Sequence, residues 1–364
     1  MNFQHGGNVW QILEKNNIPL DKLIDFSANI NPLVVSNKIQ EELKENMPLI
    51  SYYPDPYCNK LKHELSESLS IEEENILVGN GAAELIYITS AGLLPEKVTI
   101  PVPTFSEYEK SVRTYSKQSK IQFYITNEKD NFKINVNELI KYLKNTKMVF
   151  ICNPNNPTGN ILSKDELLFL NEECKKNNVI LFIDEAFINF MNNENEFTMI
   201  YNTKDNPIIV LRSFTKFFAI PGLRLGYLVA NKNIIEKIRN FQPVWSVNIL
   251  AQIAGFEVIQ DKEYIRKSKM FIEKEREFLY HQLSKIKILK VYPSYANFIL
   301  LKILYNRLDT EKLQEQLIKR NILIRDCSNF CGLNNKFFRI AVRKREENMK
   351  LLSALKRLSR GRHY

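Results

Sequence analysis

Short apolar runs, most of them followed directly by glycine or a polar residue, recur along the first two thirds of the chain. They cover residues 75–78, 98–100, 148–152, 179–183, 208–211 and 225–229. Their length and their content of Val, Ile and Leu are typical of buried strands. Segments with helical spacing of apolar residues lie between them, and the one at 164–174 begins with a capping box formed by Ser163 and Glu166. Strands that alternate with helices indicate an α/β fold with a mostly parallel sheet.

The pattern changes after residue 233, where helical spacing predominates. A long charged helix is expected over residues 262–284, followed by short strands within 296–301, 323–327 and 337–343. No Gly- or Ser-rich linker interrupts the chain, so its parts must pack closely on one another. We expect an N-terminal arm (1–45) that packs on a small C-terminal domain (251–364), and a large domain (46–250).

Composition and charge narrow the class of function. Lys and Arg outnumber Asp and Glu by 51 to 41, which gives a formal net charge of +10. The basic residues are spread along the chain except at its tail, and no nucleic-acid-binding motif accompanies them, so we expect no nucleic-acid partner. No apolar run reaches membrane-spanning length, so we expect a soluble protein without a membrane partner.

The five cysteines are odd in number and scattered, which is typical of a reducing, cytoplasmic setting. Cys327 and Cys331 lie four residues apart, but neither a second cysteine pair nor a nearby histidine completes a zinc site. We therefore expect no bound metal.

Lys216 follows a buried strand and is surrounded in sequence by apolar residues. Burial lowers the pKa of a lysine toward the neutral amine, which attacks carbonyl groups. Ser213, Thr215 and Arg224 flank it and supply hydroxyl and guanidinium donors that bind phosphate. This set suits an aldehyde that carries a phosphate, and pyridoxal phosphate (PLP) is the candidate. Residues 213–216 alone favour a simple strand-to-loop junction with an exposed lysine, but the Pro-Gly-Leu-Arg-Leu-Gly that follows favours a binding site.

Further candidate groups follow other strands. Asp184 ends an apolar strand at the sheet edge where α/β folds bind ligands, although a capping aspartate has the same signature. Gly81, Ala82 and Ala83 open a helix whose N–H groups suit a phosphate, although such a turn is common without a ligand. Tyr108 lies just past a strand, where an aromatic ring either covers a planar ligand or belongs to the core.

Three motifs carry a family resemblance. They are Asn-Pro-Asn-Asn-Pro-Thr-Gly at 153–159, Asp-Glu-Ala-Phe at 184–187, and Ser-Phe-Thr-Lys-Phe-Phe-Ala-Ile-Pro-Gly-Leu-Arg-Leu-Gly-Tyr at 213–227. In this order they resemble the class I/II aminotransferase group of fold-type-I PLP enzymes, over essentially the whole chain. Two subfamilies compete, the histidinol-phosphate aminotransferases and the decarboxylases of threonine phosphate that serve cobalamin assembly. The stretches 5–8, 25–32 and 243–248 resemble the decarboxylases.

The resemblance implies a mostly parallel seven-stranded sheet in the large domain, a smaller α/β C-terminal domain, and roles for individual residues. Lys216 would bind the PLP aldehyde covalently, Asp184 would pair with the ring nitrogen, and Asn156 would donate to the phenolic oxygen. Tyr108 would stack on the ring. The cofactor phosphate would be bound by Ala82, Ala83, Ser213, Thr215, Arg224 and, from the neighbouring subunit of a homodimer, Tyr53.

The resemblance also implies a substrate with two anionic groups. Arg339 would bind the α-carboxylate, and Arg325, with His5 and Asn31, would bind the phosphate of a phosphorylated amino acid. The implied reaction is decarboxylation of L-threonine O-3-phosphate. Transamination of histidinol phosphate stays open as an alternative, as does a non-catalytic regulator that binds PLP or nucleic acid. Many aminotransferases carry tyrosine where this chain has Phe187, and the decarboxylases share this departure.

Overall fold

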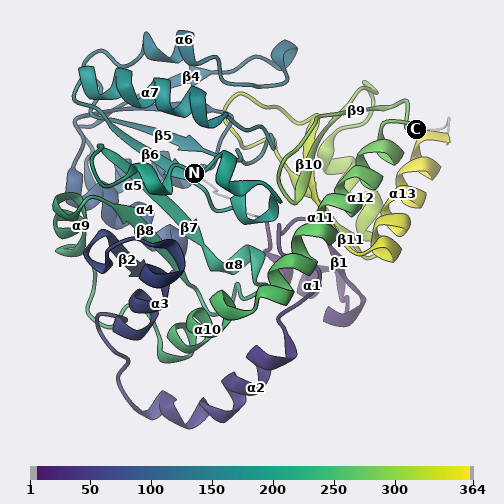
Figure 1. The fold of residues 1–364 in the computed structure, drawn as a ribbon. Coiled ribbons are helices and arrows are strands. Elements are labelled where there is room, and N and C mark those ends of the chain that lie inside the picture. Colours follow the sequence, from purple (N-terminus) through teal and green to yellow (C-terminus); the bar gives the residue numbers. More distant parts are fainter. Residues whose placement is uncertain (1–5, 361–364) are drawn as a thin grey trace.

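The computed structural model describes residues 6–360, and its larger part is a seven-stranded sheet in the order β2-β8-β7-β6-β5-β3-β4 (Figure 1). Five neighbouring strands, from β7 to β4, are parallel, whereas β8 is antiparallel to both β7 and β2. The expected α/β fold with a mostly parallel sheet is therefore confirmed. The strands are β2 (Ile76–Gly79), β3 (Lys97–Val102), β4 (Lys120–Ile125), β5 (Met148–Cys152), β6 (Ile180–Asp184), β7 (Ile208–Ser213) and β8 (Gly226–Ala230).

Helices cover both faces of this sheet, which explains why its central strands are apolar at successive positions. Ile209 and Leu211 of β7 belong to a core shared with α4 (Gly81–Leu93), α5 (Glu107–Tyr115) and α9 (Lys232–Arg239). Ile208 and Val210 point the other way, into a core shared with α3 (Asn59–Leu69), α6 (Val136–Ile140), α7 (Lys164–Lys176) and α10 (Ile249–Gln260). The sheet is thus the middle layer of three.

A second, smaller sheet lies beside the first, in the order β12-β13-β10-β9 and antiparallel throughout. Its strands are β9 (Leu289–Val291), β10 (Phe298–Ile303), β12 (Arg325–Asp326) and β13 (Phe337–Ala341). Helices α11 (Lys262–Leu283), α12 (Thr310–Ile318) and α13 (Arg345–Arg360) accompany it, and Figure 1 shows α11 running between the two parts.

The N-terminal segment contributes to the smaller part. Strand β1 (Ile24–Asp25) pairs in parallel with β11 (Ile322–Leu323), far along the chain. Helix α1 (Val9–Asn16) precedes it, and α2 (Asn37–Glu45) packs against α10. The boundaries 1–45, 46–250 and 251–364 stay predictions.

The local signals were informative about individual elements. Ser163 and Glu166 form the expected capping box at the start of α7, with the Ser163 hydroxyl accepting from the Glu166 N–H and the Glu166 carboxylate accepting from the Ser163 N–H. The charged helix α11 ends one residue before the expected position. Both results show that capping and periodicity are sufficient signals when a helix is long.

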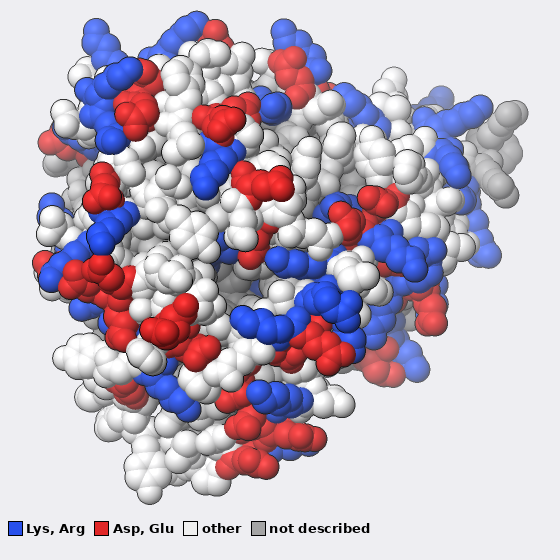
Figure 2. Space-filling model, in the orientation of Figure 1, with Lys and Arg blue, Asp and Glu red and all other residues white. Residues whose placement is uncertain are grey.

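The surface and the cysteines bear on the expected partners. Basic and acidic side chains are interspersed on the face drawn in Figure 2. Between residues 6 and 360, no helix is both long and apolar enough to cross a membrane, and no cluster of three or more His, Cys, Asp or Glu is arranged to hold a metal ion. All five cysteines are free thiols, and only Cys331 is exposed.

Candidate active site

A cavity of roughly 110 Å³ opens at the carboxyl ends of β5, β6 and β7. Because these strands are parallel and in register, the residues that follow them meet at one edge of the sheet. Cys152 lies opposite Asp184, and Asp184 lies opposite Leu211. The cavity is lined by Ala82, Ala83, Phe105, Cys152, Asn156, Asp184, Ala186, Phe187, Thr215, Lys216 and Arg224.

Lys216 lies on the short helix α8 (Phe214–Phe217), directly after β7, and its Nζ is 5.3 Å from the centroid of the Phe187 ring. Burial lowers the pKa of Lys216, the negative charge of Asp184 acts in the opposite direction, and Arg224 reinforces the lowering. A lysine in this setting gives up its proton more readily than a lysine in water, which favours reaction with a carbonyl group.

Asp184 is buried at the floor of the cavity. Its Oδ2 accepts a hydrogen bond of 2.6 Å from the Tyr108 hydroxyl, and its Oδ1 accepts one of 2.9 Å from the Ala186 N–H. Burial raises the pKa of this carboxyl, whereas the Tyr108 hydroxyl and Lys216 act to lower it. A carboxylate this deep requires a cationic partner, and it is positioned to supply its charge to a protonated ring nitrogen.

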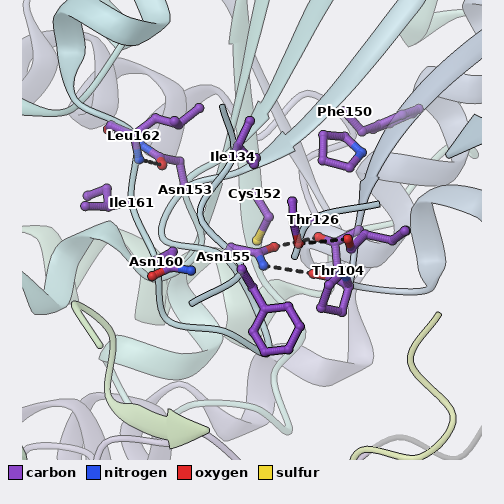
Figure 3. A pocket seen from close by; sticks show the side chains of 14 residues that line it. Thr104, Thr126, Ile134, Phe150, Cys152, Asn153, Asn155, Asn160, Ile161 and Leu162 are labelled. Carbon is purple, nitrogen blue, oxygen red and sulfur yellow. Dashed lines mark hydrogen bonds between the residues drawn. The ribbon is translucent and has the colours of Figure 1, made fainter. Parts of the chain in front are cut away.

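Residues 153–162 form a shaped turn that presents Asn156 to the cavity. The Asn153 side chain accepts from the Leu162 N–H at 2.7 Å and donates to the Leu162 carbonyl at 3.1 Å. Asn155 accepts from the Thr104 hydroxyl at 2.7 Å and donates to the Pro103 carbonyl at 2.9 Å. Figure 3 shows these side chains around a small neighbouring pocket behind the turn. Asn153 and Asn155 thus fix the backbone, and Asn156 is left for chemistry.

An anion cradle closes one end of the cavity. Helix α4 begins at Gly81, which has φ +80°, and the N–H groups of a helix's first turn have no partners within the helix. A Cβ at Gly81 would lie 2.6 Å from Nη2 of Arg224, so the guanidinium and the helix N-terminus approach closely. The Ser213 and Thr215 hydroxyls lie 2.9 Å apart beside them. This set suits a phosphate group.

Two buried arginines come from the smaller sheet. Arg325 in β12 and Arg339 in β13 are direct cross-strand partners. Arg339 donates from Nη1 to the Asn156 side chain and from Nη2 to the Ser27 carbonyl at 2.8 Å. Burial lowers the pKa of Arg339 to about 10. Arg325 donates to the Asn329 side chain at 2.8 Å. The contact between Arg339 and Asn156 joins the arginine pair to the cavity.

The cavity wall includes half of the site residues expected from the sequence, and the structure places Tyr108 and Asn31 elsewhere. Tyr108 does not line the cavity. It lies behind Asp184, and the aromatic residues on the cavity wall are Phe105 and Phe187. Phe105 directly follows the Pro-Thr pair after β3, in the same aromatic stretch as Tyr108, but it was not among the residues expected at the site.

Asn31 has a different place from the one expected. Its amide donates to the Phe217 carbonyl and to the Ser268 hydroxyl, both at 2.8 Å, so its two hydrogens are used within the protein. Its own N–H donates to the Lys216 carbonyl at 2.9 Å. Asn31 therefore anchors the N-terminal segment to α8.

A further expected residue, Tyr53, does not line the cavity. Tyr53 is 77% exposed and stacks on Trp245 at 4.3 Å between ring centroids, so it is available to a neighbouring subunit. His5 lies outside the described residues. The N–H of Gly7, near the start of the described chain, donates to the Ser27 hydroxyl at 2.9 Å, close to the backbone that Arg339 contacts.

Comparison with known proteins defines the class to which this fold and site belong. The chain matches the family described as aminotransferase class I and II over residues 21–355, and it belongs to that family.

Among its relatives, it is 37% identical over 362 residues to the threonine-phosphate decarboxylase of Salmonella typhimurium, covering 99% of this chain and 98% of the relative. It is also 37% identical to the adenosylcobalamin biosynthesis bifunctional protein CobDQ of Leptospira interrogans, covering 98% of this chain and 41% of that longer protein. A similar solved structure is the histidinol-phosphate aminotransferase of Clostridium acetobutylicum, with a TM-score of 0.85, 33% identity and coverage of 93% of this chain and 99% of that one.

Proposed function

We propose that this protein is a PLP-dependent carboxy-lyase that converts L-threonine O-3-phosphate into (R)-1-amino-2-propanol O-2-phosphate and CO₂ for cobalamin biosynthesis. The full-length similarity to a threonine-phosphate decarboxylase, and the similarity of 98% of this chain to part of a cobalamin biosynthesis protein, support the proposal. The observation that carries it is the buried cross-strand pair of Arg325 and Arg339 next to a cavity that contains a lysine of lowered pKa.

The donor set of the cavity fits PLP. Ala82, Ala83, Ser213, Thr215 and Arg224 would bind its phosphate, Asp184 its ring nitrogen, Asn156 its phenolic oxygen, and Lys216 its aldehyde carbon. The fit rests on a buried carboxylate that requires a cation and on an anion cradle too close-packed to admit a side chain at Gly81. When bound, PLP supplies an electron sink for the pair of electrons left when a bond at Cα breaks.

The two arginines bind and orient the substrate. Arg339 would bind the α-carboxylate, and Arg325 would bind the phosphate, because planar guanidinium groups match both anions. Two anchors fix rotation about the substrate's Cα–N bond and decide which bond at Cα stands perpendicular to the cofactor ring. For decarboxylation this must be the bond to the carboxylate carbon; for transamination it must be the Cα–H bond. Binding energy from the remote phosphate contributes to this orientation.

Lys216 would deliver the proton that replaces CO₂ at Cα, because it is the lysine that lines the cavity and an amine can act as a general acid and base. Phe105 and Phe187 on the wall limit the access of water. Because Arg339 donates a hydrogen bond to the Asn156 side chain, the site for the substrate carboxylate would be sensitive to the site for the cofactor.

The experiment is incubation of the PLP-loaded protein with threonine phosphate in the absence of any 2-oxo acid. Release of CO₂ and of aminopropanol phosphate supports the lyase. The histidinol-phosphate alternative has the resemblance to the Clostridium acetobutylicum enzyme in its favour. The proposal is overturned if threonine phosphate yields no CO₂ and histidinol phosphate is turned over only with 2-oxoglutarate. That result would favour the aminotransferase.

We also propose a cytoplasmic homodimer with shared active sites. Exposed aromatic residues, including Tyr53 and Trp245, are suited to an interface, and Tyr53 would reach the cofactor phosphate of the partner. Free cysteines throughout are compatible with a reducing compartment. Sedimentation analysis tests the dimer: a monomer at micromolar concentration with full PLP occupancy would contradict it.

A further inference from the structure

Tyr108 is fully buried and does not line the cavity, so contact with a ligand in the cavity does not explain its position. It lies in the first turn of α5 and is 0% exposed, and its ring stacks on that of Phe150 with centroids 5.2 Å apart and planes at 14°. The Phe105 ring meets it edge-on at 5.7 Å. In this aromatic core the hydroxyl makes one short, charge-assisted hydrogen bond, of 2.6 Å, to Oδ2 of Asp184.

We propose that Tyr108 is a positioning residue, whose hydroxyl holds Asp184 as an ionised carboxylate oriented toward the ring nitrogen of the cofactor. The proposal rests on the proposed function, in that PLP must occupy the cavity. Tyr108 and Ala186 each donate to a different carboxylate oxygen. Because a carboxylate oxygen has two lone pairs, one acceptor direction on each oxygen stays open for the ring N–H.

The charged and titratable groups around Asp184 agree with this role. They are Tyr108 from α5, Cys152 from β5 and Lys216 from α8. Burial, reinforced by the Asp184 charge, raises the pKa of the Tyr108 hydroxyl well above its ordinary value, and burial likewise raises the pKa of the Cys152 thiol. Both stay neutral, so Tyr108 acts as a permanent donor and not as an acid.

The alternative is that Tyr108 only fills space, and substitution separates the two roles. Tyr108→Phe keeps the ring that stacks on Phe150 and removes the hydroxyl. Asp184 then keeps the Ala186 N–H as donor, and its burial is unchanged, so its pKa rises. A carboxyl that takes up a proton no longer stabilises a protonated ring nitrogen, so the nitrogen loses its proton at lower pH.

The test combines the PLP dissociation constant with the ¹⁵N chemical shift of the ring nitrogen, using PLP labelled at that atom. Tyr87→Phe is a matched control. The Tyr87 hydroxyl donates to Glu107 at 2.8 Å, and neither of these residues lines the cavity. We expect Tyr108→Phe to raise the PLP dissociation constant about tenfold, which corresponds to one pKa unit in free energy. We also expect the ¹⁵N chemical shift of the ring nitrogen to move toward that of the neutral form. Tyr87→Phe should change neither quantity.

A double substitution supplies the decisive comparison. If Tyr108 acts through Asp184, Tyr108→Phe has no further effect on the PLP dissociation constant in an Asp184→Asn protein. If Tyr108→Phe does not fold, Tyr108→Gln and Tyr108→Leu, similar in size and different in their ability to donate, provide the same contrast. Wild-type binding and ¹⁵N shift in Tyr108→Phe, or equal values for the Gln and Leu variants, would overturn the inference. Absence of PLP binding by the wild-type protein would instead overturn the proposed function.

Discussion

Arg325 and Arg339 stand directly opposite each other on neighbouring antiparallel strands, so two buried guanidinium groups share one face of the small sheet. Like charges in this relationship destabilise a sheet. The arrangement makes sense if anions occupy the site, since a substrate with both a carboxylate and a phosphate supplies two. This face of the small sheet is therefore built for binding and not for stability.

Replacing either arginine by lysine removes the planar fork that matches a carboxylate or phosphate. We expect Arg339→Lys and Arg325→Lys each to lower kcat/KM for threonine phosphate by roughly 10- to 100-fold, from about 1.5–3 kcal/mol for a hydrogen bond to a charged group. Arg320→Lys, an exposed position in the same part of the protein, is the control. Steady-state kinetics provides the measurement, and a loss equal to that of the control would contradict the assignment.

Gly81 is a site where a single methyl group should weaken cofactor binding. Its φ of +80° is strained for alanine by ~1–2 kcal/mol, and the new Cβ would lie 2.6 Å from Arg224. We expect Gly81→Ala to raise the PLP dissociation constant roughly tenfold, by displacement of the guanidinium. Gly222→Ala is the matched control, because its Cβ meets nothing within 4 Å. Equal dissociation constants for the two variants would be incompatible with the cradle.

Phe187 lines the cavity near Lys216 and offers no hydrogen-bond donor. A tyrosine there adds a hydroxyl that would donate to the phenolic oxygen of PLP and stabilise its negative charge. We expect Phe187→Tyr to lower the pH at which the visible absorbance of the bound cofactor titrates. The measurement is a spectrophotometric pH titration of the two loaded proteins, and superimposable curves would refute the prediction.

The lowered pKa of Lys216 predicts the pH dependence of cofactor capture. Burial favours the neutral amine, so the reactive fraction at a given pH exceeds that of a lysine with the ordinary pKa of 10.5. The rate of PLP attachment to the cofactor-free protein should rise with pH through the lowered pKa and then level off. Stopped-flow absorbance measures this rate. A rate that continues to rise through the ordinary lysine pKa would show that the amine is not perturbed.

The sheet, Asp184 and Lys216 were predictable because each depends on signals within a few residues along the chain. Apolar runs define the strands, and in a parallel sheet the residues after β6 and β7 must meet at one edge. Asp184 and Lys216 therefore came together in the cavity as expected from their positions alone. The antiparallel strand β8 has the same apolar pattern as its parallel neighbours, so the sequence does not reveal its direction.

The positions of Tyr108 and Asn31 depend on tertiary contacts that local patterns do not encode. Phe105 and Tyr108 both follow β3, and only the start of α5 at Glu107 decides that Tyr108 turns inward beneath the sheet edge. Asn31 lies in a polar loop, but whether its amide meets a ligand or the chain depends on Phe217 and Ser268, more than 180 residues away. Polar residues in loops are ambiguous for this reason.

Covalent capture of PLP by one amine tests the account most directly. The protein is loaded with PLP, reduced with borohydride and digested, and the modified peptide is identified by mass spectrometry. We predict a single stable adduct on Lys216, and a Lys216→Ala protein that forms no adduct and does not release CO₂ from threonine phosphate. An adduct on another lysine, or normal turnover by Lys216→Ala, would contradict the central claim.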